Sequence, residues 1–265
     1  MNILVCVKQV PDTAVIQIDP GTHTLIREGV PSILNPFDSY ALEMAARIKD
    51  SQPAKIIVMS MGPPQAGDAL RECLSVGADK AYLVSDGAFG GSDTLATGYI
   101  LSRAVKAVER EEGCLDLIFC GKQAIDGDTA QVGPQLAEHL DYPQITSITE
   151  ISAGSGMARA VRETEYGSEI WESPLPVVVT VTKPAFEPRY PSIRSRMVAN
   201  KAAIPVLTLH EIEADASRSG LSGSPTKVRR TFVPPLKDTG IMISEETVPE
   251  AARKLTELLA DNGLF

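Results

Sequence analysis

Residues 115–133 of the chain have the sequence LDLIFCGKQAIDGDTAQVG. The unbroken apolar run from Leu115 to Cys120 is followed by a turn of small and polar residues, Gly121 to Asp128, and then by a helical pattern from about Thr129 to His139. Short apolar runs of this kind are typical of parallel strands whose two faces are both buried. The stretch therefore predicts a buried strand that continues through a turn into an α-helix.

The same alternation of strand and helix patterns fills the region before this stretch. Apolar runs predict strands over Asn2–Val7, Lys55–Met61, Ala81–Val84 and, further along, Val177–Thr182. Helical spacing predicts helices over 35–48, 66–76 and 92–108, the first opened by an Asn-Pro pair that is typical of a helix start. Alternation at this rhythm predicts an α/β fold: a doubly wound, mostly parallel sheet of the Rossmann-like, adenine-nucleotide-binding type.

Two further segments complete the predicted organisation. Ile145–Ile151 and Ala158–Glu165, separated by a Gly-Ser-Gly break, predict a β-hairpin (about 145–172) at the edge of the sheet, within an α/β domain of residues 1–183. After Lys183-Pro184 prolines are frequent and periodicity is weak. We therefore expect residues 184–265 to form an extended arm along another surface, such as that of another subunit, ending in a short helix over Pro249–Leu259.

Composition excludes several classes of function. The 265 residues carry 25 basic and 34 acidic side chains, a net charge of −9, which argues against a nucleic-acid binder. No secretory signal and no apolar stretch of membrane-spanning length is visible. The cysteines lack CxxC spacing and the histidines are far apart, so we expect no metal site from this chain alone. We expect a reduced, cytoplasmic protein without membrane insertion.

A ligand site is expected where the parallel strands end, because open α/β sheets bind ligands beyond the carboxyl ends of their strands. Three loops emerge there, Lys8–Asp12, Met61–Pro64 and Gly121–Asp128. Small residues at 127, 129, 130 and 133 let a bulky ligand approach the backbone, and a helix N-terminus suits a phosphate. Since carboxylates repel phosphate, we expect one of Asp126 and Asp128 to cap the helix and the other to face away or meet a ribose hydroxyl. A strand-to-helix turn with a capping Asp is the alternative.

Other sequence signals for chemistry are weak. The first strand is not followed by G-x-G-x-x-G, and Gly121-Lys122 is followed by Gln123, so there is no Walker A loop. No catalytic residue is predicted. The stretch Lys183–Lys201 has a local excess of basic charge, which could dock an acidic partner with Ile193 and Met197 as apolar anchors. A solvated loop with scattered charge explains the same stretch equally well.

Several motifs resemble one family closely, the electron-transfer flavoprotein beta subunit, in its bifurcating and nitrogen-fixation-type branch. They follow the family's order along nearly the whole chain and are Val5–Asp12 (VCVKQVPD), Asn35–Asp38 (NPFD), Met61–Pro63 (MGP), Gly77–Thr94, Gly121–Asp128 (GKQAIDGD), Glu187–Tyr190 (EPRY) and Gly220–Thr226 (GLSGSPT). The resemblance implies a heterodimer with an alpha subunit that carries the electron-delivering FAD and around which the arm wraps.

The resemblance also implies a nucleotide in the beta subunit, either FAD or AMP as a structural nucleotide. The Asp-Gly-Asp-Thr-Ala-Gln-Val-Gly run at 126–133 resembles bifurcating members, whose smaller side chains leave room for a flavin, so FAD is the favoured cofactor. Asn35-Pro36-Phe37-Asp38 lies between the two patterns. The cofactor-binding residues implied are Cys6, Val7, Lys8, Asn35, Met61, Gly121, Lys122, Gln123, Asp126, Gly127, Asp128, Thr129, Ala130, Gln131 and Val132.

The function implied by the resemblance is flavin-based electron bifurcation. NADH would reduce the beta-subunit FAD, which would pass one electron through the alpha-subunit FAD to an acyl-CoA dehydrogenase or a quinone-side acceptor, and the other to ferredoxin or flavodoxin. The resemblance implies that docking onto the acyl-CoA dehydrogenase or a related flavoenzyme would be carried by Arg189, Tyr190, Ile193, Arg194 and Met197. The alternatives are a non-bifurcating beta subunit that holds structural AMP and, setting the resemblance aside, a nucleotide-sensing or ATP-cleaving α/β protein.

Overall fold

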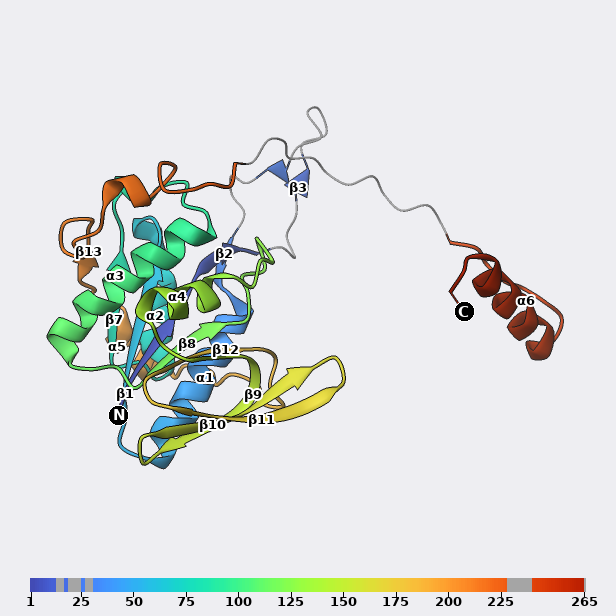
Figure 1. The fold of residues 1–265 in the computed structure, drawn as a ribbon, viewed down its shortest axis with the longest axis horizontal. Coiled ribbons are helices and arrows are strands. Elements are labelled where there is room, and N and C mark those ends of the chain that lie inside the picture. Colours follow the sequence, from blue (N-terminus) through green and yellow to red (C-terminus); the bar gives the residue numbers. More distant parts are fainter. Residues whose placement is uncertain (13–16, 19–24, 27–30, 228–239, 265) are drawn as a thin grey trace. The chain divides into compact units, whose positions relative to one another are not determined.

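The predicted alternation of strands and helices is present in the computed structural model, which describes residues 1–12, 17–18, 25–26, 31–227 and 240–264 (Figure 1). The chain divides into two compact units, Met1–Arg229 and Arg230–Phe265. Of the expected arm, residues 228–239 and 265 lie outside the described residues. The first unit carries the sheet and the candidate site.

A nine-stranded sheet forms the centre of the first unit, in the order β11-β10-β9-β12-β8-β1-β6-β7-β13. All neighbouring pairs from β13 to β9 are parallel, and β9, β10 and β11 pair antiparallel, which confirms the predicted mostly parallel sheet. The strands are β1 (Asn2–Cys6), β6 (Lys55–Met61), β7 (Lys80–Val84), β8 (Leu117–Gly121), β9 (Gln144–Gly154), β10 (Met157–Thr164), β11 (Gly167–Pro174), β12 (Val177–Val181) and β13 (Val206–Leu207).

Helices cover both faces of this sheet. They are α1 (Pro36–Ser51), α2 (Gly67–Val76), α3 (Thr94–Glu112) and α4 (Val132–Leu140). Alternate side chains of β1 point to opposite faces: Ile3 packs in a buried cluster with residues of α1 and α2, and Leu4 in a second cluster with residues of α3 and α4. The period-two alternation of fully buried strand residues thus produces a three-layer, doubly wound arrangement.

The chain order reverses next to β1. From β1 the chain proceeds through α1 to β6 and through α2 to β7 on one side, and then returns through α3 to β8 on the other side of β1. The connections that follow β1 and β8 therefore lead to helices on opposite faces. Such a reversal leaves a crevice at the carboxyl ends of the two strands, which is where ligands bind in open α/β sheets.

The predicted edge hairpin is present as β9 and β10, and a strand that the sequence pattern did not predict, β11, extends it (Figure 1). Nearly every side chain of β11 is exposed, so it lacks the alternation of buried and exposed positions by which a strand is detected. Four short strands form two additional ladders, β2 (Gln9–Pro11) with β5 (Ser32–Leu34) and β3 (Gln17–Ile18) with β4 (Leu25–Ile26).

Residues 184–227, which we expected to begin an extended arm, lie against the α/β unit. Helix α5 (Ile193–Ala199) packs on α2, β13 pairs with β7, and Ile212 is fully buried. A few buried apolar side chains thus hold this proline-rich segment against the α/β unit. Its periodicity is too weak to predict where its helix and strand lie.

The 3₁₀ turns of the first unit are Pro64–Ala66, Gly87–Phe89 and Ala216–Arg218.

The second unit contains α6 (Val248–Asp261), close to the helix predicted over 249–259. Its N-terminus is capped by Thr247, whose side chain accepts a hydrogen bond from the backbone N–H of Glu250. Every α6 side chain is exposed or only partly buried in the described chain. Within the described residues, every helix also falls short of the length and apolar character that spanning a bilayer requires.

Candidate functional site

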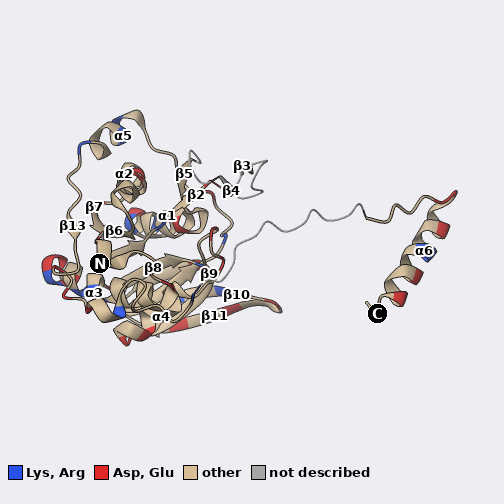
Figure 2. Cartoon of the chain, turned by 90° about the horizontal axis from the view of Figure 1, so that it is seen from above, with Lys and Arg blue, Asp and Glu red and all other residues tan. Residues whose placement is uncertain are grey.

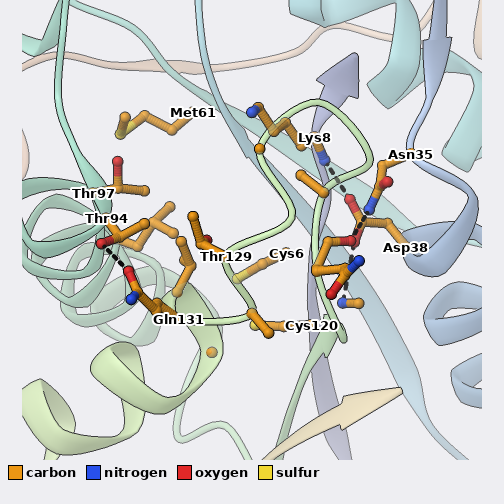
Figure 3. A pocket seen from close by; sticks show the side chains of 18 of the residues that line it. Cys6, Lys8, Asn35, Asp38, Met61, Thr94, Thr97, Cys120, Thr129 and Gln131 are labelled. Atoms are coloured by element: carbon orange, nitrogen blue, oxygen red, sulfur yellow. Dashed lines mark hydrogen bonds between the residues drawn. The ribbon is translucent and has the colours of Figure 1, made fainter. Parts of the chain in front are cut away.

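A cavity of about 330 Å³ lies at the carboxyl ends of β1 and β8, where the chain order reverses (Figure 3). Its walls come from four places: the end of β1, the N-terminus of α1, the N-terminal turns of α3, and the stretch from β8 to the start of α4. Met59 and Met61 of β6 add apolar surface. The cavity therefore joins the three loops that the sequence placed at this edge of the sheet.

Nearly all of the predicted cofactor-binding residues line this one cavity. They are Cys6, Val7, Lys8, Asn35, Met61, Gly121, Lys122, Gln123, Asp126, Gly127, Thr129, Ala130, Gln131 and Val132. Asp128 does not line it, and its carboxylate accepts a 2.7 Å hydrogen bond from Gln123 Nε2. The expectation that Asp126 or Asp128 caps the following helix is wrong: α4 begins only at Val132, and Gln131 occupies its N-cap without a side-chain hydrogen bond.

The Asp38 carboxylate connects the ends of β1 and β8 through hydrogen bonds. It lies in the first turn of α1, is 5% exposed, and accepts hydrogen bonds from the backbone N–H of Lys8 (2.7 Å) and of Gly121 (3.1 Å). Burial raises the pKa of this carboxyl to about 7, against the opposing hydrogen bonds from Asn35, Lys8 and Gly121. The buried carboxylate therefore holds the N-terminus of α1 against both edges of the crevice.

Asn35 fastens the turn that follows β8. Its side-chain amide donates to the carbonyl of Gln123 (2.9 Å) and accepts from the backbone N–H of Ile125 (3.2 Å). Its own backbone N–H donates to the carbonyl of Lys8. Gly121 has no room for a side chain here, because a Cβ would lie 2.3 Å from Asp38 Oδ1 and 2.8 Å from the backbone of Phe37.

An ion pair joins the loop after β1 to the turn after β8. Lys8 Nζ lies 2.8 and 2.7 Å from the two carboxylate oxygens of Asp126, and the side chains are 49% and 29% exposed. Because both residues line the cavity, the lysine charge offsets the nearest carboxylate that would repel an anionic ligand. The sequence analysis noted that carboxylates near this turn would repel a phosphate. The ion pair with Lys8 offsets that repulsion for Asp126.

Backbone donors are available at the start of α4. In the described part of the chain, the N–H groups of residues 129–133 donate no hydrogen bond to another protein group. Ala130 has a left-handed φ of 53°, and Gln131 is right-handed (φ −104°, ψ −29°), an alternation that turns successive N–H groups into one concave, anion-binding surface. Together with the positive end of the helix dipole, this surface suits a phosphate group.

The sequence analysis missed one wall of the cavity, which consists of Ser92, Asp93, Thr94, Thr97 and Leu101 at the start of α3. Strand β7 ends at the same edge as β1 and β8, so the strand-end rule that found the other loops would have found this one. Thr94 Oγ1 donates to Gln131 Oε1 at 2.7 Å, which links the starts of α3 and α4 (Figure 3). The other lining residues that we did not predict are Asp38, Met59, Cys120 and Ala124, whereas Gly133 is one of the small residues that the sequence placed near the ligand.

The predicted partner-docking residues lie elsewhere, on and before α5. Tyr190, Ile193 and Met197 are exposed by 93, 85 and 59% respectively, and Arg194 is exposed too, so basic residues lie along this helix (Figure 2). Arg189 differs from the others because its guanidinium is paired with Glu43 and Asp50 of α1. In the described part of the chain, no group of three or more His, Cys, Asp or Glu side chains could hold a metal ion.

Comparison with known proteins assigns the chain to a family. The fold and cavity define an α/β protein with an anion-suited pocket at a chain reversal, and residues 22–212 match the model of the electron transfer flavoprotein domain. The chain belongs to the electron transfer flavoprotein family.

The relatives are beta subunits and proteins of flavoprotein complexes. The chain is 52% identical over 255 residues to the electron transfer flavoprotein subunit beta of Megasphaera elsdenii, covering 95% of this chain and 94% of that protein. It is 48% identical over 266 residues to subunit CarD of the caffeyl-CoA reductase-Etf complex of Acetobacterium woodii, covering 100% of both. It is 40% identical over 264 residues to protein FixA of Sinorhizobium fredii, covering 96% of this chain and 92% of that protein.

The resemblance to beta subunits that the sequence motifs predicted is therefore confirmed. Membership assigns the chain an electron-transfer role, connects it with a flavin, and implies an alpha subunit as its partner in a heterodimer.

Replacing Gly121 by Ala tests the packing of α1 against the end of β8. The added Cβ would collide with Asp38 and Phe37, so we expect a loss of stability of about 1–3 kcal/mol, typical of overpacking. Gly127→Ala is the matched control, because a Cβ at Gly127 meets nothing within 4 Å. Thermal melting of the purified heterodimer measures both variants, and equal melting temperatures would contradict the described contact.

Asp38 is expected to make stability depend on pH. Its pKa is raised from an ordinary value near 3.8 to about 7, so the folded chain binds this proton more tightly than the unfolded chain. The resulting stabilisation is complete below the ordinary pKa. It falls by about 1.4 kcal/mol per pH unit between the two pKa values and is fully lost once the pH has risen through 7.

The measurement compares the melting temperature of wild type with that of Asp38→Asn between pH 5 and 8. The difference, wild type minus variant, should fall as pH rises. Infrared difference spectra should show a protonated-carboxyl band that titrates near pH 7 in wild type and is missing from the variant. A wild type without such a band would show that Asp38 is ionised throughout.

Proposed function

We propose that this beta subunit binds FAD in the cavity and takes electrons from NADH for flavin-based bifurcation. The observation that carries the proposal is the set of backbone N–H groups at residues 129–133 that donate to no group among the described residues, in a cavity at the chain reversal of the sheet. Similarity to CarD and FixA along almost their whole length supports it.

The residues present fit an adenine dinucleotide. The N–H groups at the start of α4 would hold the phosphates, and Lys8, although paired with Asp126, adds positive charge to the wall. Gly127 keeps the backbone open to a close approach, because a Cβ there would meet nothing within 4 Å. Gly133 instead lets the start of α4 pack closely on β12, since a Cβ there would lie 2.5 Å from Thr180 Cγ2. The apolar side chains of Met59, Met61 and Leu101 would exclude water from the ring system.

Bound FAD would supply the redox chemistry, accepting a hydride from NADH and releasing electrons singly. The chain itself contributes position and electrostatics. Asp38 and Asn35 hold the two sides of the crevice at a fixed separation, and the Lys8–Asp126 pair keeps the wall near neutral charge. No side chain is required to act as acid or base. The runner-up is a non-bifurcating subunit in which the same cavity holds AMP as a structural nucleotide.

The route of the electrons involves partners. One electron would pass to the FAD of the alpha subunit and on to an acyl-CoA dehydrogenase or a related, quinone-side acceptor, and the other to ferredoxin or flavodoxin. We propose that α6, whose Leu255 is 48% exposed, packs on the alpha subunit as the end of the arm. All four cysteines are free thiols, in keeping with a cytoplasmic location.

The docking surface for the dehydrogenase is proposed to consist of Tyr190, Ile193, Arg194 and Met197. Ile193 and Met197 are one helical turn apart on α5 and strongly exposed, so they form a neighbouring apolar pair of the kind that an interface covers. Arg194 gives the surface a basic rim that would steer an acidic partner into place.

Nucleotide content tests the proposed cofactor. The purified heterodimer, once denatured, should release two FAD per dimer, because each subunit holds one. Gly127→Asp should reduce this to one, since a carboxylate would be placed beside the phosphates, while the neutral, similarly sized Gly127→Asn should retain more. One FAD with one AMP would favour the structural-nucleotide alternative, and an unchanged flavin content in Gly127→Asp would move the phosphates away from this turn.

Truncating Ile193 tests the docking surface. Ile193→Ala should raise the KM for an acyl-CoA dehydrogenase about fivefold or more, since a central interface residue contributes at least about 1 kcal/mol. Flavin content and reduction by NADH should not change, because Ile193 lies outside the cavity. Ile170→Ala, on the exposed strand β11, removes the same side chain elsewhere and serves as the control. Equal KM values for the two variants would remove Ile193 from the interface.

A further inference from the structure

The segment that leads from β12 to α5 is fastened along α1. Arg47 of α1 stacks on Phe186, with its guanidinium carbon 3.9 Å from the ring centroid, and the Tyr40 hydroxyl donates to Glu187 at 3.3 Å. The strongest contact is that of Arg189, whose guanidinium lies between two carboxylates of α1. Residues 186–189 are thus held by a row of side chains on one helix.

Arg189 makes a forked set of hydrogen bonds. Its Nε and Nη2 donate to the two oxygens of Glu43 at 2.7 and 3.2 Å, and Nη2 also reaches Asp50 at 2.7 Å. The backbone N–H of Arg189 adds a bond to Glu43 at 3.1 Å. Both the backbone and the side chain of this residue are therefore fixed to α1, a bidentate geometry that lysine cannot reproduce.

The Glu43 carboxylate depends on this contact. Glu43 is only 5% exposed, and its burial by itself would raise the pKa, but the hydrogen bonds and charge of Arg189 outweigh burial and hold the pKa below its ordinary value. Arg47 Nε also donates to Glu43 at 3.1 Å, but the two bidentate bonds and the backbone bond come from Arg189, so losing Arg189 would leave this buried charge with a single partner. Arg189 is therefore committed to α1 and has little donor capacity left for an external partner.

The exposed docking surface begins immediately after this contact. Tyr190 follows Arg189 directly, Ser192 caps α5, and Ile193 and Met197 project from α5. With Arg189 bound to α1 and α5 packed on α2, both ends of the surface are held by the body of the α/β unit. The binding conformation of the surface is then present before a partner arrives, which lowers the entropic cost of association.

We propose that Arg189, together with Glu43 and Asp50, is a positioning residue that preorganises the docking surface and does not itself contact the electron-accepting flavoenzyme. This inference rests on the proposed docking role of α5. It gives Arg189 a function different from the direct partner contact expected from the sequence.

The test uses the flavin-loaded heterodimer and a purified acyl-CoA dehydrogenase that the wild type turns over. Arg189→Met and the double variant Glu43→Gln/Asp50→Asn, which keeps Arg189 and the side-chain shapes, should each raise the KM for the dehydrogenase about fivefold or more with kcat little changed. Arg189→Lys should recover part of the loss. Combining Arg189→Met with the double variant should add little, since all act on one contact.

Two further measurements separate positioning from general damage. Hydrogen exchange of residues 189–199 should accelerate in Arg189→Met and in the double variant, while flavin content and the rate of reduction by NADH stay at wild-type values. Arg103→Met is the matched control: Arg103 is 34% exposed, as Arg189 is 35%, and it pairs with Glu213 on the other face of the sheet. Its KM should be that of wild type.

The outcomes distinguish the alternatives. If Arg189→Met raises KM but the double variant leaves both KM and exchange unchanged, Arg189 contacts the partner directly and the inference is overturned. If Ile193→Ala leaves KM unchanged, the proposed docking surface is wrong. Faster hydrogen exchange in Arg189→Met and in Glu43→Gln/Asp50→Asn would still show that Arg189 holds the segment against α1. If Arg189→Met fails to fold, the double variant alone decides between positioning and direct contact.

Discussion

Two neighbouring parallel strands, β1 and β8, send their chains to opposite faces of the sheet, and the backbone N–H groups of Lys8 and Gly121 would face the resulting crevice without acceptors. The Asp38 carboxylate satisfies both from the first turn of α1. A buried N–H without a partner costs about 1–3 kcal/mol, so this one side chain stabilises both edges of the crevice. Its position also requires a glycine at 121, since a Cβ would occupy the place of the carboxylate oxygen.

The electrostatics of the cavity follow from how its acidic residues are paired. Asp38 is buried with a pKa raised to about 7, Asp126 is bound by Lys8, and Asp128 is turned to Gln123. With the carboxylates occupied in this way, the N–H groups at the start of α4, which have no acceptor among the described residues, become the dominant polar feature of the wall. An acidic protein can thus present a local site for an anion, because the sign of the field is decided by the nearest groups and not by the net charge.

Strong periodicity and helix caps made the central strands and the four packed helices predictable, and the strand-end rule located most of the cavity. Prediction failed where these signals are absent: β11 is exposed on nearly every side chain, and β13 and α5 are short and held by few buried residues. The start of α4 lies later than predicted because Asp128 and Ala130 adopt left-handed conformations. Aspartate visits this region more readily than most residues, but an alanine gives no sign of it. The roles of Asp38 and Arg189 depend on contacts between residues far apart in the sequence, which a pattern of neighbours does not encode.

Helix α1 connects the two functional regions of this chain. Its first turn holds the cavity through Asn35 and Asp38, and its later turns hold the start of the proposed docking surface through Glu43 and Asp50. Along a helix the separation of such residues is set by regular hydrogen bonding, so it varies far less than the length of a loop. Electron transfer depends on the distance and orientation between donor and acceptor. Placing the proposed cofactor cavity and the proposed docking surface on one helix would therefore give a docked partner a defined position relative to the cavity, although the residues that line each are far apart in sequence.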